Sequence, residues 1–272
     1  GGEQVKVHTC GAWSQGPFTH EALAMLQHLD LEKMGYGSEA YFHTLAETFK
    51  LTLADREAYL GDPDFVDVPL AQLTSASYAA ERAALIDATA APGMPMPGRA
   101  GDVEPYLSPV ISRTEPERLP ADTSIVAVVD RFGNALCATP SDTSWDTPVV
   151  PGTGLAVSSR GHQSWAVHRH PSSLAPGKRP RLTPNPCLLE CEGQWLMPFG
   201  TPGGDQQIQA NVQTIVSHLR FGMPLQCAIE APRLITHSHP DSFAPHHASP
   251  GRLTIEGRVD LGTTEGLAAR GH

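Results

Sequence analysis

Thr123 has the position of a possible N-terminal nucleophile. It follows Leu119-Pro120-Ala121-Asp122 and opens an apolar, β-branched run that extends to Asp130. Cleavage of the Asp122–Thr123 bond would give Thr123 a free α-amine beside its own hydroxyl, and that amine can serve as the general base. With a pKa of about 8, much of the amine is neutral at working pH. The alternative is structural, because β-branched residues favour strands.

A pair of glycines lies between an apolar segment and a helical one, in Gly200-Thr-Pro-Gly-Gly-Asp205. Consecutive glycines let the backbone approach a ligand closely. Free N–H groups at a helix N-terminus attract negative charge. Gly203 and Gly204 could therefore form an oxyanion hole. The alternative is an ordinary strand-to-helix turn in which Asp205 is the N-cap; the spacing fits neither a Walker loop nor G-x-G-x-x-G.

Two other segments supply polar groups. Ser141 belongs to a hydroxyl-rich loop over residues 139–145, and it could hydrogen-bond a nucleophile on the neighbouring strand. Such clusters also form ordinary turns. Arg160, in the segment 158–163, could bind a substrate carboxylate through its planar set of N–H donors. An exposed surface arginine is the alternative.

The residue pattern favours neither a metal nor an organic cofactor. Histidines gather near the C-terminal end, at His237, His239, His246 and His247. Proline, serine and aspartate surround them, which predicts an irregular loop rather than a metal-binding helix. His43 and Glu47 share a helix face without forming H-E-x-x-H, so we expect a packed or surface pair. The nucleophile, base and oxyanion donors considered above are all protein groups, so the chemistry requires no cofactor.

The elements that must position these residues change type along the chain. Hydrophobic spacing predicts helices over 20–34, from an N-cap at Ser38 to about 60, and over 77–87. In the second helix Leu45, Phe49 and Leu53 form one stripe, and Lys50, Arg56 and Glu57 lie mostly outside it. A proline-rich connection over 88–122 follows, and connections of that length are usually functional or disordered.

After the connection, the pattern predicts two hairpins and two helices. Residues 124–130 are almost wholly apolar, so we expect a strand that is buried on both faces and pairs with 135–139. The second hairpin joins 187–191 to 194–199, and helices are expected over 205–221 and 224–233. Helices packed beside antiparallel hairpins indicate a layered α and β domain.

Composition excludes several classes of protein. The chain has 272 residues, and 19 basic against 29 acidic side chains give a net charge of −10, which argues against nucleic-acid binding. No apolar run is long enough to span a membrane, and no signal peptide is visible at the N-terminus. Five cysteines do not make a disulfide scaffold, and we expect Cys187 and Cys191 to be buried free thiols.

Taken in order, five segments resemble the γ-glutamyltransferase family. Residues 45–56 (LAETFKLTLADR) and 59–66 (YLGDPDFV) are similar to the late large subunit of that family. Residues 124–134 (SIVAVVDRFGN) are similar to the start of the small subunit. Residues 148–154 (PVVPGTG) and 200–204 (GTPGG) complete the pattern.

The resemblance implies a mixed α+β fold, the four-layer αββα sandwich of N-terminal-nucleophile hydrolases. Residues 1–122 would form the end of a large-subunit-like region, with a proline-rich processing linker, and 123–272 a small-subunit-like catalytic region of the same domain. The precursor would cut itself at Asp122–Thr123. Thr123 would then attack γ-glutamyl amides such as glutathione, and water or an amine would resolve the acyl-enzyme.

The resemblance also assigns supporting roles. Ser141 takes the place of a supporting hydroxyl, usually threonine, and Gly203 and Gly204 take the places of the oxyanion-hole glycines. Thr183 falls on the second of two serines that contact substrate; the first is Leu182 here.

Recognition of the substrate's α-amino acid group departs from the family pattern. An asparagine that helps to hold substrate aligns near Asp142, and an acidic residue that binds the α-amine aligns near Gln163, which carries no charge. Two alternatives to a γ-glutamyltransferase therefore stay open: an amidohydrolase or acylase that acts on another acyl amide, and a non-catalytic homologue with a binding role.

Family members are about twice as long as this chain. We expect the N-terminal half of the large subunit and the C-terminal end to lie outside it, on a longer gene product or a partner chain. The arginine that binds the substrate carboxylate in the family belongs to that missing part. A homo-oligomer is also open. Many relatives are exported, but the sequence leaves the compartment unassigned.

Overall fold

The structure is a computed structural model that describes residues 4–112, 123–142 and 147–272. Its central sheet is antiparallel and has the order β1–β5–β6. Strands β1 (Val5–His8) and β5 (Cys187–Cys191) pair with Val5 opposite Cys191, and β6 (Trp195–Phe199) follows β5 as a hairpin. The predicted hairpin over 187–199 is confirmed, whereas β1 had no counterpart in the sequence pattern.

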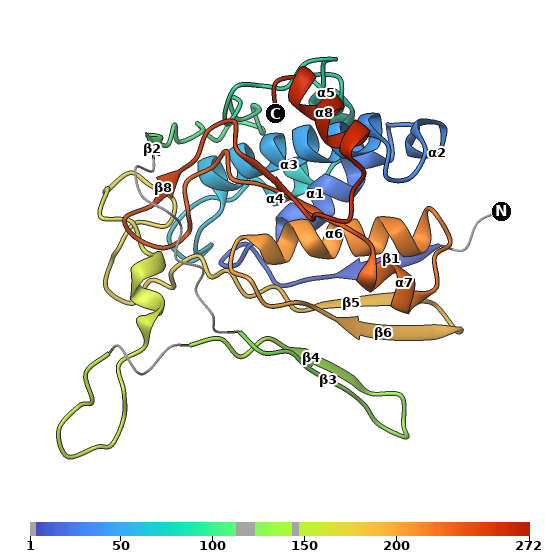
Figure 1. Cartoon of the computed structure of the whole chain (residues 1–272). Helices are drawn as coiled ribbons and strands as arrows, with labels where there is room; N and C mark the ends of the chain where they lie inside the picture. Colours follow the sequence, from blue (N-terminus) through green and yellow to red (C-terminus); the bar gives the residue numbers. More distant parts are fainter. Residues whose placement is uncertain (1–3, 113–122, 143–146) are drawn as a thin grey trace.

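Three long helices cover one face of this sheet (Figure 1). They are α1 (Gly16–Leu26), α3 (Glu39–Tyr59) and α6 (Gln206–Leu219). Alternate side chains of β5 are buried, among them the free thiols of Cys187 and Cys191, as expected. The main apolar cluster joins the helices, with Phe18, Leu45, Phe49, Ile208 and Val212 at its centre.

A single helix over 20–34 was predicted, and this prediction is wrong. α1 starts earlier, at Gly16, with proline in its first turn, and it ends at Leu26. A separate short helix, α2 (Leu31–Met34), begins after Asp30. The Asp30 carboxylate accepts a hydrogen bond from the N–H of Lys33. This N-cap begins a new helix where the hydrophobic spacing had suggested a single one.

α3 has the predicted start, because the Ser38 hydroxyl accepts from the N–H of Tyr41. Its burial goes beyond the apolar stripe. Lys50, Arg56 and Glu57 lie outside the stripe and are nevertheless buried. Charged side chains are rarely buried unless they are paired, and ion pairs join Lys50 to Glu47 and Arg56 to Glu57.

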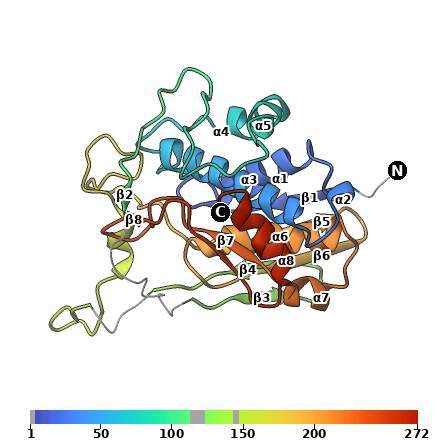
Figure 2. The same ribbon diagram turned by 45° about the horizontal axis from the view of Figure 1, so that its top comes forward.

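Shorter elements complete the described part of the chain. The helix predicted over 77–87 is α5 (Ala76–Ala83), and the helix predicted over 224–233 is α7 (Leu225–Glu230). Helix α8 (Leu261–Ala269) packs against α3 (Figure 2). The remaining elements are short: α4 (Leu70–Leu73), the 3₁₀ helix η1 (Ser159–Gln163), and the strand pairs β2 (Ile111–Ser112) with β8 (His247–Ala248) and β7 (Leu234–Thr236) with β9 (Leu253–Ile255).

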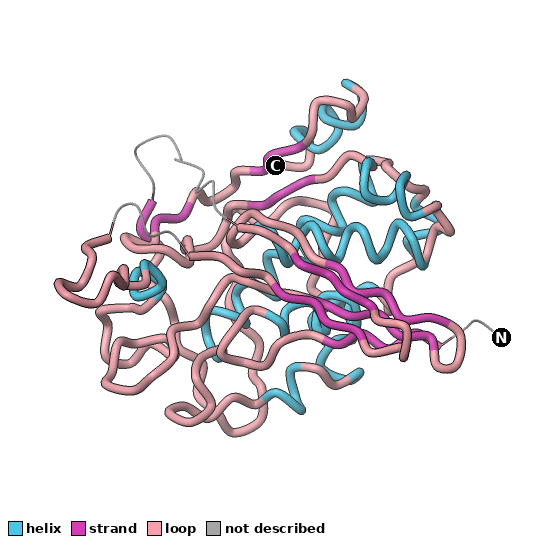
Figure 3. Tube along the Cα trace, turned by 90° about the horizontal axis from the view of Figure 1, so that it is seen from below, coloured by secondary structure: helices cyan, strands magenta, loops and turns pink. Residues whose placement is uncertain are grey.

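The hairpin of β3 (Val126–Val129) and β4 (Ala135–Ala138) lies on the side of the sheet away from the helices. The hairpin was predicted, but the burial of its first strand on both faces is wrong. Val128 is 50% exposed and Phe132, in the turn, is 75% exposed. In Figure 3 the strands lie in front of the helices, and none of the described elements covers the hairpin on this side. In the described part of the chain, no helix is long and apolar enough to cross a membrane.

Candidate active site

Hairpin β3–β4 brings Thr123 and Ser141 together. Thr123 lies just before β3 and Ser141 just after β4, and antiparallel pairing places the two ends side by side. The N–H of Ser124 donates to the carbonyl of Pro140 at 3.0 Å and extends this pairing. The Thr123 Oγ1 and Ser141 Oγ atoms are 2.6 Å apart, which is hydrogen-bonding distance. Asp122, on the other side of the expected cleavage bond, lies outside the described residues.

Arg160 extends this contact toward the glycine loop. Its Nη2 donates to Ser141 Oγ at 2.7 Å, and its guanidinium carbon lies 5.3 Å from the centre of the Phe243 ring. A Cβ atom on Gly204 would lie 3.8 Å from Cε2 of Phe243. Contacts thus connect Thr123, through Ser141 and Arg160, to Phe243, whose ring lies beside Gly204.

Asp142 fixes the loop that carries Arg160. Its Oδ1 accepts from both the N–H (3.0 Å) and the hydroxyl (2.9 Å) of Ser159, at the start of η1. Burial tends to raise the pKa of the Asp142 carboxyl, but hydrogen bonds from Ser158 and Ser159 outweigh it and hold that pKa below its usual value. The carboxylate is therefore the ionised anchor of this loop.

The glycine loop has a backbone that favours glycine. Gly203 has φ +122° and Gly204 has φ +55°, both in the region that L-residues with side chains rarely adopt. Among the residues that the structure describes, neither of the two N–H groups has an acceptor. Both glycines line a pocket with His237, His239, Asp241 and Phe243. Two unused N–H donors beside a pocket can bind an oxyanion.

Asp205 is not the capping side chain that the ordinary-turn interpretation required. It makes no capping hydrogen bond to α6. Instead its Oδ1 accepts from Arg56 Nη1 and from the Ser242 hydroxyl, each at 2.6 Å, and its Oδ2 accepts from the Ser242 N–H at 2.7 Å. These contacts hold the residue that follows the glycine pair.

Gln163 and Thr183 lie together in the interior. Gln163 Nε2 donates to Thr183 Oγ1 at 3.0 Å, and both residues are buried. Gln163 Oε1 is also buried, and it has no hydrogen-bond partner among the described residues. A buried acceptor without a partner is costly, so this oxygen is suited to receive a donor from a ligand.

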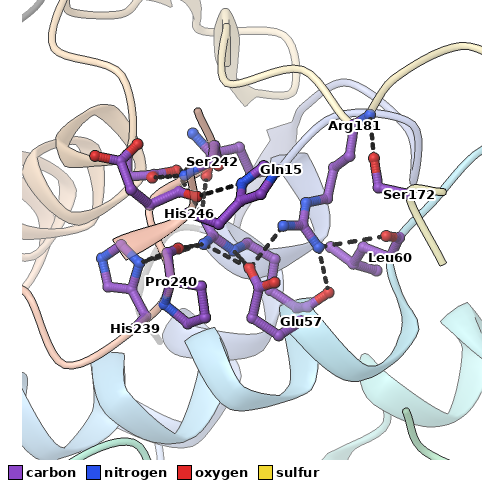
Figure 4. A network of polar contacts seen from close by, with 12 residues as sticks. Gln15, Glu57, Leu60, Ser172, Arg181, His239, Pro240, Ser242 and His246 are labelled. Atoms are coloured by element: carbon purple, nitrogen blue, oxygen red, sulfur yellow. Dashed lines mark hydrogen bonds and ion pairs between the residues drawn. The ribbon is translucent and has the colours of Figure 1, made fainter. Parts of the chain in front are cut away.

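Sequence reasoning missed the buried polar network behind the glycine loop (Figure 4). Arg56, Glu57, Arg181 and Asp205 form it, and their two positive charges balance two negative ones. Arg181 Nη2 donates to Glu57 Oε1 at 2.6 Å. Burial raises the pKa of Glu57, but Arg181 and Arg56 outweigh it and hold that pKa far below its usual range. The one sign of this network in the sequence was the group of charged residues in α3 that lie outside the apolar stripe.

Two histidines border this network, and both favour their neutral forms. Burial lowers the pKa of His170 to about 4, against the opposing effect of Glu57. Burial, together with the charge of Arg56, also lowers the pKa of His239. Protonation of either would add a positive charge to a network whose charges already balance.

One described cluster has the composition of a metal site. Ligand atoms of His43, Glu47 and His272 lie within 4.8 Å of one another. The Glu47 oxygens are already used, since one accepts from the Lys50 ammonium at 2.7 Å and the other from the Ala91 N–H at 3.1 Å. His43 and His272 share a hydrogen bond of 2.8 Å. The arrangement is that of a packed polar cluster, and we assign no metal to it.

The layered α+β fold defines the class first: it is part of the N-terminal-nucleophile hydrolase fold, which the matching solved structures share. The sequence profile of the family described as Gamma-glutamyltranspeptidase matches residues 2–272. The chain therefore belongs to the γ-glutamyltranspeptidase family, as its motifs predicted.

Three relatives illustrate the match. The glutathione hydrolase proenzyme of Bacillus subtilis (strain 168) is 32% identical over 231 residues, which cover 83% of this chain and 39% of the relative. The solved structure titled "Structure of LmbA2991HD" is 40% identical, with a TM-score of 0.88, over 98% of this chain and 47% of that one. The cephalosporin acylase from Bacillus halodurans is 26% identical, with a TM-score of 0.77, over 98% and 44%.

The chain thus spans less than half of the length of each of these relatives. Two of these relatives are named as a glutathione hydrolase and a cephalosporin acylase.

Proposed function

We propose that the full protein is an autoprocessed amidase with Thr123 as its N-terminal nucleophile. The observation that carries the proposal is the 2.6 Å contact between Thr123 Oγ1 and Ser141 Oγ at the start of β3. Cleavage of the Asp122–Thr123 bond frees the α-amine that acts as general base. The relative from Bacillus subtilis is named as a proenzyme, which supports a precursor that is cut.

The reaction then follows from the residues at hand. The Thr123 hydroxyl attacks the amide carbonyl while its proton passes to the α-amine. The N–H groups of Gly203 and Gly204 stabilise the oxyanion of the tetrahedral intermediate. The intermediate collapses to an ester on Thr123 as the leaving amine takes up the proton. Water or an acceptor amine attacks that ester, regenerates the hydroxyl and releases the acid or a new amide.

We propose γ-glutamyl or related acyl amides as substrates. Arg160 is one hydrogen bond removed from the Thr123–Ser141 pair and would bind a carboxylate on the acyl group. Asp142, Gln163 and Thr183 are the other residues that we place in the substrate-binding part of the site. Gln163 presents a neutral acceptor rather than a charge, and this favours a second candidate, an acylase for acyl groups without an α-amine.

We also propose that a further segment, on the same gene product or on a partner chain, covers hairpin β3–β4. Val126, Val128 and Leu136 are each at least 44% exposed. Contiguous exposed apolar surface of this kind typically marks an interface. Because the chain spans less than half of its relatives' length, proteins of this family contain further segments that are available to cover the hairpin.

Two measurements on the full-length gene product test the proposal. The first is the intact mass, beside a Thr123→Ala variant. We expect two pieces from the wild type, the second beginning at Thr123, and one uncut chain from the variant. A wild type that stays uncut would favour a non-catalytic homologue.

The second measurement compares turnover of γ-glutamyl p-nitroanilide and glutaryl p-nitroanilide, which differ only in the α-amino group. Preference for the first supports γ-glutamyl chemistry, and preference for the second supports the acylase. Undiminished turnover by Thr123→Ala would exclude this mechanism.

A further inference from the structure

The Arg56 guanidinium lies at the centre of the polar network behind the glycine loop. Its side chain is fully buried in α3. One nitrogen, Nη1, donates both to Asp205 Oδ1 and to Gln15 Oε1, each at 2.6 Å. The Nε and Nη2 atoms donate to Glu57 Oε1 at 3.1 and 2.7 Å. Every N–H-bearing atom of the guanidinium is thus bonded within the network.

Both contacts of Arg56 Nη1 lead to the glycine pair. Asp205 is the next residue after Gly204. Gln15 Nε2 donates to the Gly204 carbonyl at 3.2 Å and to the Thr183 carbonyl at 2.9 Å. Figure 4 shows Gln15 within the same network as Glu57 and Arg181. One guanidinium therefore holds the loop from two directions, through the carbonyl of Gly204 and through the side chain of Asp205.

Helix α6 holds the glycine pair only through its carbonyls, which accept from the N–H groups of Gln206 (2.9 Å) and Gln207 (3.2 Å). Gly203 and Gly204 precede α6, and both have positive φ. An oxyanion hole works only when its N–H donors are fixed before charge develops. A displacement of about 1 Å can reduce a rate by about 10²-fold. A buried ion network is a weak source of stability, so its position behind two unused N–H donors points to a role in geometry.

We propose that Arg56 is a positioning residue, which orients the N–H groups of Gly203 and Gly204 toward the carbonyl that Thr123 attacks. It acts through Gln15 and Asp205 and does not touch the substrate. The inference rests on the proposed function. It also gives the region before the cleavage bond a part in catalysis, since Arg56 and Gln15 precede Asp122 and the loop follows Thr123.

Arg82 provides a matched control for the loss of a buried arginine. Its side chain is 5% exposed, and its Nε donates to Asp55 Oδ2 at 2.9 Å. Its Nη2 donates to Asp55 Oδ1 and to the Leu51 carbonyl. Neither partner touches the glycine loop, so a change at Arg82 costs stability without reaching the donors.

The test compares Arg56→Lys, Gln15→Met and Arg82→Lys in the full-length protein. Three properties are measured for each variant: the thermal midpoint, kcat and KM on the better p-nitroanilide, and the Kd of (3-carboxypropyl)boronic acid. The boronic acid forms a tetrahedral anion with the Thr123 oxygen, so its affinity reports on the oxyanion site without turnover. Gln15→Met removes the hydrogen bond to the Gly204 carbonyl, with those to Thr183 and Arg56, but removes no charge. It covers the case in which Arg56→Lys does not fold.

Arg56→Lys and Gln15→Met should lower kcat about 10- to 100-fold and weaken the boronic acid by a similar factor, with KM changed less than threefold. Arg82→Lys should lower the thermal midpoint with kcat and the boronic acid affinity unchanged. Equal catalytic losses at Arg56 and Arg82, or full boronic acid affinity in Gln15→Met, would overturn the inference. If Thr123→Ala retains turnover, the proposed function itself fails, and that result is separate from these.

Discussion

The hydroxyl oxygens of Thr123 and Ser141 lie 2.6 Å apart although 18 positions separate them in the sequence. The register of hairpin β3–β4 produces this proximity, because Val126 pairs with Ala138 and the flanking residues continue alongside. We propose that Ser141 orients the attacking oxygen of Thr123 and that Arg160, which donates to Ser141 Oγ, in turn orients Ser141. We therefore expect activity to depend on the Ser141 hydroxyl rather than on the size of the side chain.

Replacement of Ser141 should therefore depend on the hydroxyl. Ser141→Ala removes the contact to Thr123, and we expect kcat to fall about 10- to 100-fold, the size of a lost, well-oriented catalytic hydrogen bond. Ser141→Thr keeps the hydroxyl and should retain most of the activity. Turnover on the preferred p-nitroanilide and the mass of the processed chain measure both. Equal losses in the two variants would show that packing, not the hydroxyl, is important.

Arg160 should select acyl groups that carry a carboxylate. Arg160→Gln removes a charge-assisted contact, so we expect KM for glutaryl p-nitroanilide to rise about 10- to 100-fold. Butyryl p-nitroanilide lacks the carboxylate and serves as the control substrate, on which kcat/KM should fall only through the lost contact to Ser141, and so less than on the glutaryl substrate. A similar loss on both substrates would mean that Arg160 acts only through Ser141.

Gln163 should control the preference for an α-amino group. Its buried Oε1 has no partner among the described residues, and Gln163→Glu would place a carboxylate there. An ammonium group on the substrate gains an ion pair in that variant. The ratio of kcat/KM for γ-glutamyl over glutaryl p-nitroanilide should therefore rise at least about 10-fold. Gln163→Met, which has no acceptor, should not raise the ratio; an unchanged ratio in the glutamate variant would place the α-amine elsewhere.

Local signals predicted those parts of the fold that depend on neighbours in sequence. Ser38 caps α3, and the hairpins around 131–134 and 192–193 lie where turn residues predicted them. The continuous spacing over 20–34 misled, because Asp30 offered a cap that periodicity alone does not weigh. The apolar run at 126–129 was equally misleading about burial, since the burial of a strand depends on which other segments pack against it.

The candidate site followed the same division. The sequence singled out Thr123, Ser141, Gly203 and Gly204, because each has a distinctive type or a motif around it. Arg56 and Gln15 escaped notice, since their importance lies in contacts 41 to 189 positions away along the chain. The only sign of such long-range contacts in the sequence is a charged residue in a helix that is otherwise buried.

Mild acid should weaken the fold through His170. This side chain is buried, with its Nδ1 accepting from the Ser172 N–H and its Nε2 facing Glu57. Glu57, Arg181 and His246 are the charged or titratable groups that act on it, and burial is the largest cause of its pKa of about 4. In the unfolded chain its pKa is the ordinary value of 6.5. Between these two values the unfolded state binds more protons, so stability falls as pH falls.

For His170 alone, the free energy of unfolding should drop by about 2 kcal/mol between pH 7 and pH 5. Urea unfolding of the full-length protein at pH 7, 6 and 5 measures how the free energy of unfolding falls with pH. In His170→Gln the drop between pH 7 and pH 5 should be smaller by about 2 kcal/mol. Glutamine retains polar atoms near Glu57 and Ser172 but cannot titrate, so the variant separates protonation from packing. A slope in His170→Gln equal to that of the wild type would show that other groups, such as His239, carry the acid sensitivity.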